Sequence, residues 1–116
     1  MNTGTINIWR LDKDPLIKAM LLMLADKAGP DSFIIIEPEK LDCRAVRIAS
    51  SRSPEELSAY IYTYAQQEKH FGLDLEFPYL IETRADDQTI RLNDLDINQV
   101  FEKVTEHLEI SLHTHS

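Results

Sequence analysis

The sequence predicts an α+β fold in which a mixed β-sheet of about five or six strands packs against three helices. Three segments combine apolar residues at helical spacing with residues that cap helix ends. Several shorter segments alternate apolar and polar residues, as strands with one covered face do. The expected element order is βαββαβββα. A sandwich related to the ferredoxin-like plan fits this order first, and a thioredoxin-like α/β arrangement is the alternative.

The first elements are a strand, a helix and a second strand. Residues 5–11 alternate, with Ile6 and Ile8 on one side, which predicts a strand. Asp14 precedes Pro15, so we expect a helix that begins there and ends before Gly29. The unbroken apolar run 33–36 predicts a central strand covered on both faces. A right-handed parallel crossover would join these two strands.

The middle of the chain predicts a strand followed by a helix. Residues 45–49 alternate again and indicate a strand. Ser53 and Glu56 have the spacing of a capping box, and Gly72 provides a stop, so we expect a second helix between them. Its expected apolar face consists of Leu57, Tyr60, Ile61, Tyr64 and Ala65.

The next segments predict a strand and a hairpin. Residues 73–77 alternate and indicate a strand with one solvated face. Residues 79–83 and 89–92 flank a polar turn, which predicts two antiparallel strands. In this register Ile81 faces Leu92, and Glu82 lies opposite Arg91 as a cross-strand pair of opposite charge.

The stretch NDLDINQV raises the question of a calcium loop, because Asp94, Asp96 and Asn98 have alternate spacing. A calcium loop needs glycine at its sixth position and glutamate at its twelfth. Counted from Asp94, these positions hold Gln99 and Thr105, so both requirements fail. The sequence therefore predicts no metal site here.

A helix start explains the same residues. Asp96 is placed to cap the helix, and Gln99 completes a capping box three residues later. Leu95 and Val100 have the spacing of a hydrophobic staple. The apolar face of this third helix is expected to contain Ile97, Val100, Phe101, Val104 and Leu108.

Length and composition predict one soluble cytoplasmic domain. The 116 residues are 43% hydrophobic, which is enough for one core, and flexible tails are expected at residues 1–4 and 113–116. No signal peptide or membrane-length apolar run is found, and the single cysteine, Cys43, fits a reducing compartment. The net charge of −8 argues against nucleic acid and anionic membranes as partners and favours a basic partner.

No catalytic, cofactor or metal site is predicted. Cys43 lies beside Arg44, which could lower the pKa of a thiol, but no histidine is near in sequence to act as a base. His70 fits the end of the expected second helix, where a cation complements the helix dipole. His113 and His115 lie in the expected tail, which rarely builds a closed metal site.

Three residues are candidates for an interaction surface. Tyr62 and Leu22 are expected on the outward sides of the second and first helices, and Trp9 on the strand face opposite Ile6 and Ile8. These residues favour a non-catalytic protein that binds a protein partner or a second copy of itself. The alternative is an enzyme or small-ligand binder with a pocket between sheet and helices, built from Cys43, His70 or the tyrosines of AYIYTY.

Overall fold

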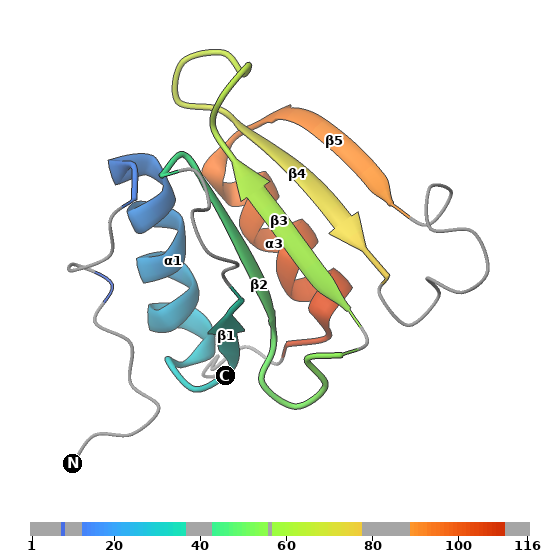
Figure 1. The fold of residues 1–116 in the computed structure, drawn as a ribbon. Coiled ribbons are helices and arrows are strands. Elements are labelled where there is room, and N and C mark those ends of the chain that lie inside the picture. The colour runs from blue at the N-terminus through green and yellow to red at the C-terminus, as the bar shows by residue number, and fades with distance from the viewer. Residues whose placement is uncertain (1–7, 9–12, 37–42, 56, 78–88, 111–116) are drawn as a thin grey trace.

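The fold consists of an antiparallel sheet, with one described helix before its strands in the chain and another after them. The computed structural model describes residues 8, 13–36, 43–55, 57–77 and 89–110. The elements are α1 (Pro15–Ala28), β1 (Phe33–Ile35), β2 (Ala45–Ser50), β3 (Ser58–Tyr62), β4 (Phe71–Glu76), β5 (Ile90–Leu95) and α3 (Ile97–Leu108). The five strands pair in chain order, and every pairing is antiparallel (Figure 1). Each strand therefore returns beside the one before it.

Both described helices lie on the same face of the sheet (Figure 1). Period-two alternation sends one set of strand residues toward them and the other set away. The core consists mainly of Ile17, Met20, Leu21 and Leu24 from α1, Phe33, Val46, Ile48, Ala59, Ile61, Phe71 and Leu73 from the sheet, and Val100, Phe101, Val104 and Leu108 from α3. Neither described helix is long and apolar enough to cross a membrane.

The start of α1 is fixed by Asp14, as the sequence predicts. Its Oδ1 accepts a hydrogen bond from the Leu16 amide at 3.4 Å, and Pro15 occupies the first turn. Oδ2 accepts a second bond, from the Thr63 hydroxyl at 3.0 Å, and the Asp14 amide donates to the Cys43 carbonyl at 2.8 Å. The same residue thus caps the helix and ties it to the ends of β2 and β3.

Both ends of α3 are also attached by specific bonds. The predicted capping box is confirmed: Asp96 Oδ1 accepts from the Gln99 amide at 2.8 Å, and Gln99 Oε1 accepts from the Asp96 amide at 2.9 Å. Near the other end, His107 Nε2 lies 3.0 Å from the carbonyl oxygens of both Ser58 and Glu76. These two residues are directly paired across β3 and β4, so α3 is held to the end of that hairpin.

The predicted helix between Ser53 and Gly72 is wrong. Residues 58–62 form β3 and residues 71–76 form β4, and the two strands pair with Ser58 opposite Glu76 and Tyr62 opposite Gly72. Ala59 and Ile61 enter the core, while Tyr60 between them projects to the other face. A strand pairing on both sides therefore overrides the capping signal at Ser53.

The predictions of a mixed sheet and of three helices are also wrong. The described sheet is wholly antiparallel, and the described part of the chain contains two helices. Because the five described strands pair in chain order and each pairing is antiparallel, this sheet has neither the ferredoxin-like nor the thioredoxin-like arrangement. Residues 33–35 form the edge strand β1 rather than a central one, and Ile34 is 37% exposed. The strand predicted at 5–11 lies outside the described residues except for Ile8, which is buried in the core.

Only the second strand of the predicted hairpin lies among the described residues. The strand predicted at 89–92 is confirmed within β5, whereas 79–83 lies outside the described residues. The strand that pairs with β5 is β4, which places Leu92 opposite Leu73 and Arg91 opposite Asp74. Arg91 forms an ion pair with Asp74, whereas Glu82, its predicted partner, lies outside the described residues.

The capping role of Asp96 predicts the stability of two variants. Asp96→Ala should lower the free energy of unfolding by about 1 kcal/mol, because the Gln99 amide in the first turn of α3 loses its acceptor. Asp96→Asn should remain close to the parent, since asparagine caps equally well. Urea denaturation followed by circular dichroism measures both. A calcium-dependent rise in the unfolding midpoint that Asp96→Ala abolishes would instead assign these residues to a cation.

Candidate functional site

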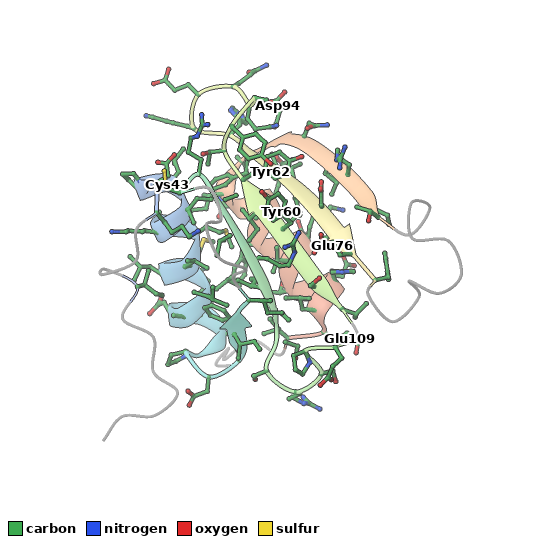
Figure 2. The ribbon with its side chains drawn as sticks, viewed as in Figure 1. Cys43, Tyr60, Tyr62, Glu76, Asp94 and Glu109 are labelled. Atoms are coloured by element: carbon green, nitrogen blue, oxygen red, sulfur yellow. The ribbon has the colours of Figure 1, made fainter. Side chains whose placement is uncertain are left out.

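The face of the sheet that the described helices leave uncovered carries a layer of tyrosine, arginine and carboxylate side chains. Figure 2 shows Tyr60, Tyr62 and Glu76 on this side of the strands. We call it the open face and define it by Arg44, Arg47, Tyr60, Tyr62, Tyr64, Asp74, Glu76, Arg91 and Asn93. Its members come from β2, β3, β4 and β5, except Arg44, which directly precedes β2, and Tyr64, which lies two residues after β3.

An ion pair crosses the middle of the open face. Arg47 of β2 donates from Nε and Nη2 to the two carboxylate oxygens of Glu76 in β4, at 2.9 and 3.1 Å. Strand β3 lies between them, and the guanidinium passes 4.8 Å from the centre of the Tyr60 ring. The Ser58 hydroxyl donates to the same carboxylate at 2.8 Å. Hydrogen bonding to Glu76 raises the pKa of Arg47, so its positive charge is fixed.

The tyrosines form a continuous stack along β3. Tyr60 and Tyr62 have ring centres 5.5 Å apart, and Tyr62 and Tyr64 stack at 4.7 Å with an interplanar angle of 24°. Arg47 covers Tyr60 at one end, and the guanidinium of Arg44 lies 5.7 Å from the Tyr64 ring centre at the other. Aromatic and cation–π contacts of this geometry favour one conformation of the whole row.

The ring of Tyr62 lies on the backbone of Gly72, its partner in β4. A Cβ atom at Gly72 would overlap Cε2 and Cζ of that ring and stand 2.7 Å from its hydroxyl oxygen. Glycine is required here because the ring occupies the space of the missing side chain. Tyr62 is only 6% exposed, although it lies on the open face.

A second ion pair joins β4 to β5. Arg91 donates from Nε and Nη2 to Asp74 at 3.1 and 3.2 Å, and the Tyr62 hydroxyl donates to Asp74 Oδ1 at 3.3 Å. The Asp74 side chain is nearly buried, whereas the Arg91 side chain is 66% exposed. Burial raises the pKa of Tyr62 and the charge of Asp74 raises it further, so this hydroxyl stays a donor.

An open depression of about 290 Å³ lies where the stack meets β5, and its lining includes Tyr64, Gln66, Arg91 and Asn93. Gln66 holds the loop after β3 against β5: its Nε2 donates to Asn93 Oδ1 at 3.3 Å, and its Oε1 accepts from the Asp94 amide. Asp94 Oδ1 accepts from the Gln67 amide at 2.8 Å, so this carboxylate fixes loop backbone.

The three predicted interaction residues do not come together on one surface. Tyr62 is buried in a strand rather than outward on a helix, so that placement is wrong. Leu22 is partly buried and packs against the core. Trp9 lies outside the described residues. Their role in binding stays a prediction.

The residues considered for catalysis or metal binding lie at different places in the fold. Cys43 is exposed at the end of the sheet near the start of α1 (Figure 2). His70 bonds through Nδ1 to the carbonyl of Glu68 at 2.9 Å, in the loop before β4. Among the described residues no group of three or more histidine, cysteine, aspartate and glutamate side chains is placed to hold a metal ion. His113 and His115 lie outside them.

Reasoning from the sequence missed most of the open face. The alternation of tyrosine with isoleucine and threonine in YIYTY is the signal for it, since period two places Tyr60, Tyr62 and Tyr64 on one side of an extended chain. Assigning a helix to this segment hid that pattern.

Comparison with protein-family models, with curated proteins and with solved structures finds no match for this chain. The geometry of the open face therefore provides the grounds for assigning a function.

The contact between Tyr62 and Gly72 predicts a non-additive pair of substitutions. Gly72→Ala should destabilise the protein by about 1–3 kcal/mol, because the new methyl group displaces a packed ring. In a Tyr62→Ala background the same change should be neutral or stabilising, since alanine is better than glycine in a strand. Urea denaturation of the four proteins measures the coupling. Equal costs of Gly72→Ala in both backgrounds would contradict the contact.

Proposed function

We propose that this protein acts by binding another protein through the open face. The observation that carries the proposal is the ordered row of tyrosines between two guanidinium groups, on the side of the sheet without a described helix. Tyrosine and arginine are the side chains most enriched at the energetic centres of protein interfaces. A surface of this composition is suited to recognition.

Preorganisation supports the same proposal. Binding costs conformational entropy whenever side chains must be ordered at an interface. Here Tyr60 and Tyr64 are half-buried, and their hydroxyl oxygens lie 3.2 Å apart within hydrogen-bonding distance. Arg47 is held by Glu76 through two hydrogen bonds, from Nε and Nη2. A partner would therefore meet side chains whose conformations are already set.

Self-association is a second possibility that a separate observation favours. The edge strands of the described sheet carry the exposed apolar residues Ile34 in β1 and Ile90 in β5, the latter 50% exposed. An edge strand presents unpaired backbone groups to a second chain. Sedimentation velocity of the parent and of Ile90→Lys separates this from binding at the open face, because an edge-paired dimer should dissociate in the variant.

The double variant Tyr60→Ala, Tyr64→Ala should lose its partner. We expect the affinity to fall at least about tenfold, because truncating central aromatic anchors commonly costs that much or more. The measurement is affinity capture from the native host with quantitative mass spectrometry, followed by titration of the captured protein.

The matched control is Glu102→Ala, Lys103→Ala, which truncates two exposed residues of α3 on the other side of the molecule. Both variants should keep the parent circular dichroism spectrum. Tyr64→Phe tests the stack with the ring retained and should keep most of the binding. If the α3 variant loses the partner and the tyrosine variant retains it, the proposal is wrong.

A further inference from the structure

Four ionised groups of the open face are paired with one another. Arg47 and Glu76 form one pair and Arg91 and Asp74 the other, each through two hydrogen bonds. These two positive and two negative groups cancel, so the net charge of −8 belongs to the rest of the chain. A partner can therefore cover the two pairs without leaving any of these charges buried and unpaired.

The side of the molecule that carries α3 has a different charge. Glu102 and Glu106 are exposed on this helix against Lys103, and the exposed Glu109 directly follows it. A strongly basic partner would be attracted to these carboxylates rather than to the paired charges of the open face. Two copies of the chain would repel one another if they met at α3. The partner of the open face is therefore expected to be nearly neutral where it makes contact.

The tyrosine row gives the open face an aromatic centre beside the two ion pairs. Tyr62 contacts the rings of both Tyr60 and Tyr64, so the three side chains form one layer above β3. Two sheets commonly pack face to face about 10 Å apart, with the side chains of the inner faces between them. A twofold dimer needs a surface that is complementary to itself. A nearly neutral aromatic sheet face meets this requirement without bringing unpaired like charges together.

Resting on the proposed function, we infer that the protein bound at the open face is a second copy of this chain, docked through its own open face. The two sheets form the inner layers of the dimer, and α1 and α3 of each copy lie on the outside. The carboxylates of α3 then stay in solvent, on the sides of the dimer that face away from each other. Because the net negative charge of both copies still opposes association, added salt strengthens the dimer by screening it.

Sedimentation equilibrium of the full chain at low and high salt tests this inference. The parent should form dimers that tighten as salt is added, and Asn93→Asp should weaken them at least about fivefold at low salt. Asn93 is exposed on the open face, and aspartate keeps the oxygen that accepts the bond from Gln66 while it adds one negative charge. A twofold dimer brings two such charges into the interface, one from each copy.

Asn98→Asp is the matched control, because it makes the same substitution at an exposed position in the first turn of α3 and should leave the dimer unchanged. Ile90→Lys should also leave it unchanged, since Ile90 adjoins Arg91 in β5 and points to the other side of the sheet. A dimer that Ile90→Lys dissociates and Asn93→Asp does not would overturn the inference in favour of pairing between edge strands.

Three further outcomes would also overturn the second copy as partner. They are a chain that stays monomeric at about 1 mM in high salt, a dimer that weakens as salt is added, and equal weakening by Asn93→Asp and Asn98→Asp. In each case the proposed function stands if the open face variant Tyr60→Ala, Tyr64→Ala loses a different captured protein that the α3 variant retains. Loss of that protein by the α3 variant alone would contradict the proposed function itself.

Discussion

The structure depends on one constraint: both described helices cover the same face of the sheet. Because side chains along a strand point alternately to the two faces, every second residue must lie on the face opposite the helices. Strand β3 shows the consequence most clearly. Ala59 and Ile61 are buried against the helices, so Tyr60 and Tyr62 must project to the other side. Large aromatic side chains in that position need partners to remain ordered, and the stack, Gly72 and the two ion pairs provide them.

The ion pairs have a second effect beyond linking strands. Each holds a guanidinium and a carboxylate in a fixed arrangement on the open face, and in the pair of Arg91 with Asp74 the carboxylate is the covered partner. Exposed ion pairs add little stability in general, but two-point contacts between arginine and a carboxylate fix geometry well. The open face is therefore better understood as an ordered recognition surface than as a source of stability.

The sequence predicts the elements whose ends are marked by local chemistry. Asp14 and Pro15 locate α1, and Asp96 with Gln99 locates α3, because capping bonds form between neighbours in the chain. Alternation locates β2 and β4 for the same local reason. The sequence also excludes a standard calcium loop at Asp94, and this residue is found bonded to loop backbone.

The segment between Ser53 and Gly72 could not be assigned in this way. Its apolar residues satisfy both helical and period-two spacing, and the choice depends on pairing with β2 and β4, which are distant in sequence. The turn between β3 and β4 also lacks a glycine signal, because its left-handed positions are held by Ala65 and Lys69. The sequence does not reveal the open face because this surface exists only when the four strands β2 to β5 align.

Hydroxyl-radical footprinting of the protein, alone and with its captured partner, tests the central claim most directly. It reports the solvent access of individual side chains without any substitution. The account predicts that oxidation of Tyr60 and Tyr64 falls in the complex, while oxidation of the exposed side of α3 is unchanged. Unchanged oxidation of both tyrosines, with protection of α1 or α3 instead, would contradict the open face as the binding surface.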